Sequence, residues 1–266
     1  MQQQQRLNRI LDALSTDGHL TIDEIVERFE VSAATARRDL GTLAQQRLIT
    51  RTHGGAVAVG SAYELPLHYK IARNAEAKIA IAHTAAELIN PGETLGLTGG
   101  TTTTELARVL GADPRMAAED QPGITVLTNA LNIAYELAIR SHIKLVLTGG
   151  VARTQSFELV GPMVGRALQD LVLDWAIIGV DGLDVRFGAT TVDEGEAAVN
   201  RDLVKAARRV LVVADHSKMG NTAFGRICDL GSVTDLVTDG DVEPGLAAAL
   251  AEAGVNVVVA APRRRP

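Results

Sequence analysis

The first sixty residues contain three successive stripes of apolar side chains, followed by an alternating pattern. The stripes are Leu7, Ile10, Leu11 and Leu14, then Ile22, Ile25, Val26 and Phe29, then Ala36, Leu40 and Leu43. Their spacing of three and four residues predicts three short amphipathic helices. The stretch LITRTHGGAVAV (48–59) then has two β-prone runs on either side of HGG, which predicts a hairpin.

Polar residues mark the beginnings of the second and third predicted helices. Thr21 has Glu24 three positions later, which is the pattern of a capping box, and Ser32 is placed to cap the third helix. Three capped helices followed by a hairpin with basic residues predict a winged helix-turn-helix.

The free face of the third helix has the residue types that DNA recognition needs. Its small first residues allow a close approach to the major groove, where Arg37 or Arg38 could reach guanine edges or phosphates, while Arg51 on the hairpin would meet the backbone. The predicted DNA-contacting residues are Thr21, Ser32, Ala33, Ala34, Thr35, Arg37, Arg38, Arg51 and His53. Two alternative interpretations remain open. Paired arginines can simply keep a helix face solvated, and some winged helices bind proteins instead of DNA.

After residue 74, near-continuous apolar runs alternate with helical patterns. The runs are TLGLTGG, ITVLTN, IKLVLTGG, WAIIGVDGLD, RVLVVADHSK, TDLVTD and VNVVVA, and the helical patterns lie at about 75–89, 101–111, 130–140, 161–171, 195–208 and 243–253. This alternation predicts an α/β domain with a mainly parallel sheet covered on both faces. The expected domains are 1–59, a linker at 60–74, an effector domain at 75–260 and a basic tail at 261–266.

Polar residues gather where these predicted strands end, and parallel sheets bind ligands at that edge. In LTGGTTTTELARVL (97–110), two glycines and four threonines precede a helical pattern, so backbone N–H groups and hydroxyls could hold a phosphate. The other strand-end residues are Thr128, Asn129, Gly149, Gly150, Asp181, Asp184, Asp215 and Lys218. Tight turns use the same residue types, but several such ends in one sheet favour a small phosphorylated ligand.

Composition and charge narrow the possible functions. The 266 residues are 46% hydrophobic and 22% charged, without an apolar run of the roughly 20 residues that a membrane span needs. A single cysteine, Cys228, fits a reducing compartment, and the N-terminal residues lack the order of a secretory signal, so we expect a cytoplasmic protein. The net charge of the whole chain is −6, but residues 31–60 are basic, with four arginines and one aspartate. Such a segment is typical of a DNA-binding surface.

Several common sites are not expected. The sequence has no GxxxxGK[ST] motif, GLTGGT does not fit GxGxxG, and the six histidines lack the spacing of metal ligands. We therefore predict no cofactor and no metal.

Taken together, these motifs resemble the DeoR family of bacterial transcriptional regulators. In the first domain the resemblance rests on RLNRILDAL, VSAATARRDLGTL and RLITRTHGGAV, and in the second on KIAIAHTAAELINPGETLGLTGGTTTTELA, TVLTNALNIAYELA, LTGG, IIGVDGLD and ADHSK. One departure is Ala36, where members usually have isoleucine or valine. The resemblance implies a repressor of a sugar-catabolism operon that a phosphorylated sugar releases from its operator. Because one winged helix makes few contacts, we expect a homo-oligomer.

The second domain of that family resembles ribose-5-phosphate isomerase, in which a GTGST loop holds the phosphate. Here TGGTT takes its place, ADHSK offers a lysine, and two aspartates match that enzyme's pair. The effector residues that this implies, together with neighbouring strand ends, are Gly99, Gly100, Thr101, Thr102, Thr103, Asn129, Gly150, Asp181, Asp184 and Lys218.

The catalytic residues of that isomerase are not matched. Where the enzyme has a lysine and a glutamate, this chain reads DEGEAAVNRDL, with Asp193 or Glu194 at the lysine position and Asp202 at the glutamate position. The resemblance thus implies a sensor that binds its ligand without turning it over. The alternatives are an isomerase-like enzyme with an accessory N-terminal domain and a scaffold that does not bind DNA.

Overall fold

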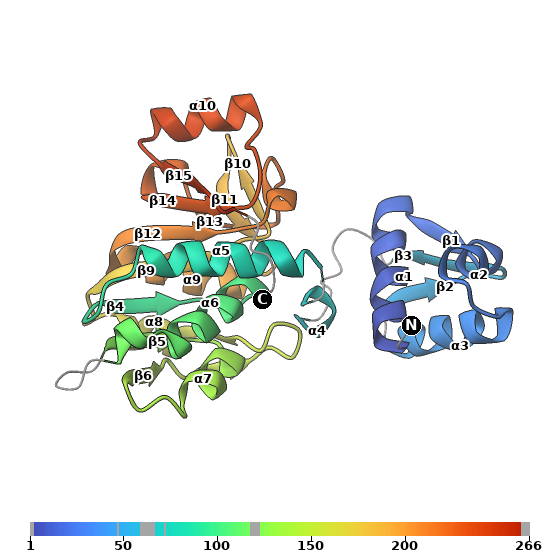
Figure 1. Ribbon diagram of the computed structural model, residues 1–266, viewed down its shortest axis with the longest axis horizontal. Helices are drawn as coiled ribbons and strands as arrows, with labels where there is room; N and C mark the ends of the chain where they lie inside the picture. Colours follow the sequence, from blue (N-terminus) through green and yellow to red (C-terminus); the bar gives the residue numbers. More distant parts are fainter. Residues whose placement is uncertain (1–2, 47, 59–66, 72, 118–122, 262–266) are drawn as a thin grey trace. The chain divides into compact units, whose positions relative to one another are not determined.

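The computed structural model describes residues 3–46, 48–58, 67–71, 73–117 and 123–261 (Figure 1). The chain divides into two compact units, Met1–Arg73 and Asn74–Pro266. The predicted basic tail lies almost entirely outside the described residues, as does much of the predicted linker. A short helix, α4 (Leu67–Lys70), occupies part of that linker, and Tyr69 from it is buried in the core of the first unit.

The N-terminal unit is the predicted winged helix-turn-helix. Its helices are α1 (Gln3–Asp17), α2 (Ile22–Phe29) and α3 (Ala33–Gln45), and its strands are β1 (His19–Thr21), β2 (Ile49–Arg51) and β3 (Gly55–Ala58). The strands form an antiparallel sheet in the order β1-β3-β2, in which β2 and β3 are the predicted hairpin. Strand β1 was not predicted, because three residues are too few to show a period of two.

Both predicted helix caps are present. Thr21 Oγ1 accepts a hydrogen bond from the Glu24 N–H at 3.2 Å, and Glu24 Oε2 accepts from the Thr21 N–H at 2.7 Å, which completes the capping box. At the start of α3, Ser32 Oγ accepts from the Thr35 N–H at 3.2 Å. The predicted apolar stripes of all three helices supply most of the core of this unit.

An ion pair between α1 and α3 fixes the position of the third helix. The Arg6 guanidinium donates two hydrogen bonds to the Asp39 carboxylate, the Nη2–Oδ1 bond being 3.1 Å long. The Asp39 side chain is only 1% exposed and lies among the apolar residues of the α3 stripe. A buried carboxylate needs such a partner, because its desolvation is otherwise very costly.

The C-terminal unit is built on seven parallel strands in the order β15-β14-β12-β9-β4-β5-β6. These strands are β4 (Thr94–Leu97), β5 (Ile124–Thr128), β6 (Ile143–Leu147), β9 (Leu173–Gly179), β12 (Ala207–Val213), β14 (Asp235–Thr238) and β15 (Asn256–Val259). The covering helices are α5 (Ala75–Glu87), α6 (Thr101–Ala112), α7 (Leu131–Leu137), α8 (Pro162–Leu168), α9 (Glu194–Ala206) and α10 (Pro244–Glu252). The prediction of a mainly parallel, doubly covered sheet is confirmed (Figure 1).

Alternate residues of the central strand β9 belong to opposite cores. Trp175 and Ile177 pack in the cluster under α5, α6 and α7, whereas Ala176 and Ile178 pack in the cluster under α8, α9 and α10. A strand buried on both faces has no polar side to display, which is why its sequence is a continuous apolar run.

The run WAIIGVDGLD is not the single strand that its sequence suggests. Its last three residues, β10 (Gly182–Asp184), leave the parallel sheet and form a small antiparallel sheet with β11 (Gly188–Thr191) and β13 (Gly225–Cys228). A further hairpin consists of β7 (Val151–Ala152) and β8 (Leu159–Val160). The sequence did not predict β7, β8, β11 or β13, because each is short and none lies in one of the long apolar runs.

The buried ion pair gives a stability prediction. We expect Asp39→Ala to lower the free energy of unfolding of the N-terminal unit by about 1.5–3 kcal/mol, because it removes the charged acceptor of two hydrogen bonds from the partly buried Arg6 guanidinium. Far-UV circular dichroism follows both units during urea unfolding, whereas fluorescence of Trp175, the only tryptophan, follows the C-terminal unit.

The matched control is the exposed pair of Arg28 and Asp17, whose atoms are 2.5 Å apart. Asp17→Ala should cost at most about 1 kcal/mol. Equal losses in the two variants would contradict a locking role for Asp39.

Candidate functional site

The N-terminal unit exposes arginines on one side of α3 and on the hairpin. Ala34 and Arg38 lie directly opposite the buried stripe of α3, Arg37 lies beside them, and all three are exposed. Arg51 on β2 and His53 in the hairpin turn are exposed as well. We call the exposed surface of these five residues the arginine face.

The remaining predicted DNA-contacting residues build the caps that support this face. The side chain of Thr21 is held by Glu24, and Ser32 Oγ lies 3.0 Å from Thr35 Oγ1. Thr21 and Ser32 are nevertheless exposed, and Ala33 is half-buried. Their backbone and hydroxyl groups are therefore at the surface, at the beginnings of two helices.

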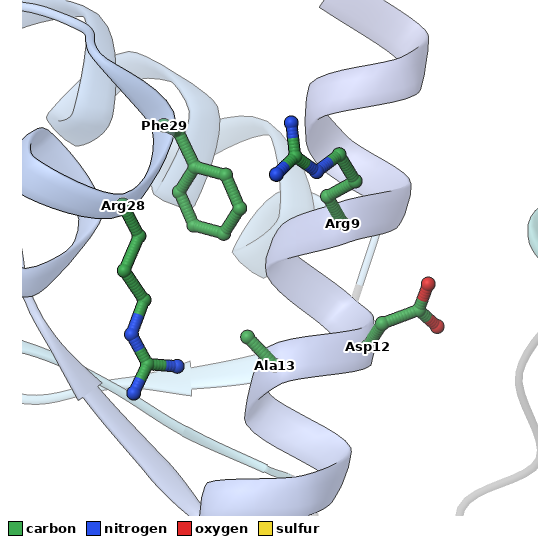
Figure 2. Close-up of a pocket in the computed structure, with 5 residues that line it drawn as sticks. All are labelled: Arg9, Asp12, Ala13, Arg28 and Phe29. Atoms are coloured by element: carbon green, nitrogen blue, oxygen red, sulfur yellow. The ribbon is translucent and has the colours of Figure 1, made fainter.

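A shallow pocket of about 430 Å³ opens between α1 and α2 of the same unit (Figure 2). It is lined by Arg9, Asp12, Ala13, Arg28 and Phe29, and the Arg9 guanidinium lies 5.3 Å from the centre of the Phe29 ring. None of these residues belongs to α3 or the hairpin, so the pocket is separate from the arginine face.

In the C-terminal unit, the loop between β4 and α6 has the features of an anion cradle. Gly100 precedes α6 with a φ of 128°, a backbone conformation that glycine adopts easily and other residues rarely do. No side chain caps this helix. The N–H groups of the first turn therefore lie at the N-terminus of a twelve-residue helix without a capping side chain. Thr103 Oγ1 donates to the Gly100 carbonyl at 3.1 Å, which holds the loop in shape.

A buried glutamate that the sequence did not single out packs against this loop. A Cβ atom at Gly99 would overlap the Glu158 side chain, so the close approach requires glycine there. The fully buried Asn129 donates from Nδ2 to Glu158 Oε2 at 2.9 Å, and its own Oδ1 has no partner among the described residues. The structure thus brings Gly99, Asn129 and Glu158 together.

Lys218 and Asp181 meet at the end of the neighbouring strand β9. Lys218 Nζ lies 3.3 Å from Asp181 Oδ1, and Asp181 Oδ2 accepts from Thr191 Oγ1 at 3.1 Å. The cradle borders the same strand end, because the Gly179 N–H donates to Thr98 Oγ1 at 3.1 Å. The predicted lysine and the predicted loop therefore lie on either side of one strand end.

Asp215 is held ionised beside Lys218. It accepts from Asn74 Nδ2 at 2.8 Å and from the Ser217 N–H at 3.1 Å. Burial by itself would raise the pKa of Asp215, but the hydrogen bonds from Ser217 and Asn74 and the charge of Lys218 bring this pKa below its usual value. Lys78, one helical turn after Asn74, is a buried cation that the sequence gave no reason to select.

Two predicted effector residues have structural roles in turns. Asp184 Oδ1 accepts from the N–H groups of Arg186 and Phe187 at 2.8 and 3.0 Å, so it caps the turn between β10 and β11. Gly150 has a φ of 129° and packs its backbone against Val160 at the base of the β7–β8 hairpin.

The β7–β8 hairpin supplies a cation to two carboxylates at the start of α9. Arg153 pairs with Glu196 and with Asp193, the latter at 3.2 Å. Glu196 Oε2 in turn accepts from Thr191 Oγ1 at 3.3 Å. Sequence reasoning missed Arg153, Glu158 and Glu196, because they lie 5 to 43 residues apart and no motif links them.

Other kinds of site have no support in the described part of the chain. It contains no group of His, Cys, Asp and Glu residues that could hold a metal ion, and none of its helices is long and apolar enough to span a membrane. Burial raises the pKa of the Cys228 thiol to about 12, which makes it unreactive near neutral pH.

Comparisons with known proteins match both units. A model of the DeoR-like helix-turn-helix domain matches residues 6–62, and a model of the DeoR C-terminal sensor domain matches residues 73–240. The chain is 33% identical over 239 residues to the glycerol-3-phosphate regulon repressor of Escherichia coli, covering 90% of this chain and 92% of that protein. It is 34% identical over 247 residues to the transcriptional repressor GlcR of Bacillus subtilis, covering 90% and 89%. Among solved structures, ribose 5-phosphate isomerase A of Methanocaldococcus jannaschii is similar over 55% of this chain and 54% of that chain, with 21% identity and a TM-score of 0.40.

The low pKa of Asp215 leads to a prediction about stability. Because the folded pKa lies below the unfolded value of about 3.9, the ionised carboxylate stabilises the fold fully above that pH, and its contribution is lost as the pH falls through the folded pKa. We expect Asp215→Asn to cost about 1–3 kcal/mol at both pH 7 and pH 5.5, and less below pH 4. Urea unfolding monitored by Trp175 fluorescence measures this, with Asp241→Asn, an exposed aspartate, as control. A penalty that grows as the pH falls would contradict the assignment.

Proposed function

The chain belongs to the DeoR family of transcriptional regulators, and we propose that it represses a sugar-catabolism operon until a phosphorylated sugar binds to its C-terminal unit. Like the repressors to which it is similar, it is a DNA-binding regulator and not an enzyme. Its partners in this proposal are operator DNA, a sugar phosphate and a second copy of itself, and its place of action is the cytoplasm.

The arginine face is the proposed DNA-binding surface. Ala34 leaves room for the backbone of α3 to approach the major groove, and Arg37 and Arg38 reach outward from the same turn. Arg51 and His53 extend the positive surface onto the wing, where phosphates would be contacted. The Arg6–Asp39 ion pair supports this role, since recognition of base edges requires a helix that is held rigidly.

The cradle beside Lys218 is the proposed effector site, and this juxtaposition is the observation on which the proposal rests. An uncapped helix N-terminus and a lysine, on either side of the end of β9, offer N–H groups and a counter-charge to a phosphate. Asp181, Glu158 and the Oδ1 atom of Asn129 offer acceptors to sugar hydroxyls. A phosphorylated sugar has both kinds of group.

The residues at the positions of the isomerase's catalytic groups support sensing instead of turnover. Asp193 caps α9 and pairs with Arg153, so its carboxylate is neutralised locally. Asp202 faces the surface, where it lies 3.9 Å from Lys205 and next to Gly165 of α8. A base at that place cannot reach a C–H bond at the ends of the strands.

The proposal is tested on DNA from upstream of the protein's own gene. Fluorescence anisotropy of a labelled duplex is measured with increasing protein and then with added phosphates of glycerol, ribose, fructose, glucose and glucosamine. We expect tight, salt-dependent binding and release by one of these compounds. If every compound leaves operator affinity unchanged, the proposed effector class is wrong.

The arginine face gives a prediction about specificity. Arg38→Ala or Arg37→Ala should cost about 1–3 kcal/mol of operator affinity and relax the preference at one base pair, because a bidentate contact to guanine is lost. Arg51→Ala should weaken binding to operator and scrambled duplexes alike and reduce the salt slope by about 1. Arg28→Ala, outside this face, is the control. Unchanged affinity in a double Arg37→Ala, Arg38→Ala variant would rule out α3 as the recognition helix.

The effector site gives a prediction about induction. Lys218→Ala and Thr101→Val should weaken release by the active sugar phosphate at least about tenfold, because each removes a group that binds the phosphate, while operator affinity stays unchanged. Lys205→Ala, which removes an exposed lysine of α9, should respond as the unaltered protein does. Loss of DNA binding with normal effector binding would contradict this division of roles.

A further inference from the structure

The two units are joined at the Arg73–Asn74 peptide bond, and both residues are anchored by their side chains. Arg73 is the last residue of the N-terminal unit, and its Nε lies 2.7 Å from Asp12 Oδ1 of α1 in the same unit. Asn74 is the first residue of the C-terminal unit, where its Nδ2 donates to Asp215 Oδ1 at 2.8 Å. One peptide bond therefore connects a residue held by the DNA-binding unit to a residue held at the proposed effector site.

The conformation of Asn74 is unusual for a residue that precedes a helix. Its φ is 49° and its ψ is 37°, in the left-handed region, whereas a residue at this position usually has an extended backbone. Its side chain does not cap α5, although asparagine is among the best capping residues. The amide binds Asp215 instead, 141 positions away in the sequence, so its contact serves the tertiary structure and not the local helix.

Asp215 also shapes the turn that presents Lys218. Its Oδ1 accepts from the N–H and the Oγ of Ser217 at 3.1 and 2.5 Å, and its carbonyl accepts from the Lys218 N–H at 3.0 Å. Asn74 and this turn thus share one carboxylate oxygen, in a residue that is only 3% exposed. A movement of the turn therefore changes the geometry of the Asn74 hydrogen bond.

A phosphate beside Lys218 acts on the same carboxylate through its charge. Lys218 Nζ lies 3.3 Å from Asp181 Oδ1, and its positive charge also acts on Asp215. A phosphate bound to Lys218 brings negative charge close to Asp215, and like charges repel more strongly in a partly buried site than in water. The arrangement in which Asp215 holds Asn74 is therefore less favourable when a phosphate is bound.

We propose that Asn74 is a positioning residue that transmits the effector response from the phosphate site to the DNA-binding unit. The Asn74–Asp215 hydrogen bond stabilises the arrangement of the chain that binds the operator. A phosphate at Lys218 opposes that bond and so displaces the Arg73–Asn74 junction. This inference rests on the proposed function, for which it supplies the differential contact that a ligand needs in order to shift a conformational equilibrium.

The first variant is Asn74→Gly, which removes the amide and keeps a backbone conformation that glycine adopts freely. Operator affinity is measured by fluorescence anisotropy, and binding of the phosphates of glycerol, ribose, fructose, glucose and glucosamine is measured by calorimetry without DNA. We expect the variant to bind operator at least about fivefold more weakly, and to bind the releasing compound more tightly by a similar factor. The opposite signs are the diagnostic result, because a loss of structure would weaken both.

Asn256→Ala is the matched control. Asn256 Nδ2 donates to Asp235 Oδ1 at 2.9 Å, and Asp235 is 2% exposed, so this pair is close to that of Asn74 and Asp215 in length and burial. It lies where β14 and β15 begin, whereas Asp215 follows the end of β12, so the two pairs are at opposite edges of the parallel sheet. Only Asn74→Gly should change the two affinities. Circular dichroism verifies that both variants fold.

The second variant inserts two glycines between Arg73 and Asn74. Both side-chain contacts can still form, but the flexible insertion leaves slack between them. We expect the variant to keep its affinity for operator and for the releasing compound. The release itself, which is the ratio of operator affinities without and with that compound, should fall at least about tenfold.

Two results would overturn the inference and leave the proposed function in place. One is an Asn74→Gly variant that matches the unaltered protein in both affinities, or that loses both together. The other is an insertion variant that is released as fully as the unaltered protein. If none of the five compounds releases the unaltered protein from operator, the proposed function fails and the inference fails with it.

Discussion

Parallel pairing on both sides of β9 is the constraint on which the C-terminal unit depends. Strands β4 and β12 flank β9 in the same direction, so the residues that follow all three emerge at one edge of the sheet. The Thr98 loop, Asp181 and Lys218 come together for that reason alone, although they span 120 positions of the sequence. The apolar run that buries β9 on both faces therefore also positions the polar groups of the site.

Around that edge, polar contacts join elements that the sheet does not connect. Arg153 of the β7–β8 hairpin binds Glu196 of α9, and the single hydroxyl hydrogen of Thr191, in the small sheet, is shared between Glu196 and Asp181. Asp181 then meets Lys218. The charged groups of such a partly buried network stabilise one another only while each group keeps its partner. In the function we propose, a bound phosphate would compete with Asp181 for Lys218, and the contacts of Asp181 would pass that change to the small sheet and the hairpin.

Much of the fold and part of the candidate site could be predicted from the sequence. Periodic apolar stripes predicted the helices, and long apolar runs predicted the seven parallel strands. The glycines and threonines after Leu97 predicted the cradle. Strands β7, β8, β11 and β13 could not be predicted, because, unlike the equally short β4, β14 and β15, they do not lie in an apolar run long enough to stand out. Glu158 could not be predicted either, since its role depends on packing against Gly99, 59 positions earlier.

The sequence by itself determined the local interactions, and the tertiary structure decided the distant ones. The capping box of Thr21 and Glu24 closes across three residues, so the spacing of two letters is enough to specify it. Arg6 and Asp39 lie 33 positions apart, and Asn74 and Asp215 lie 141 positions apart. No spacing rule relates such pairs, because the loop between them can close in many ways until the packing of helices and strands selects one. The sequence thus specified which chemical groups are present, and the packed sheet specified which of them meet.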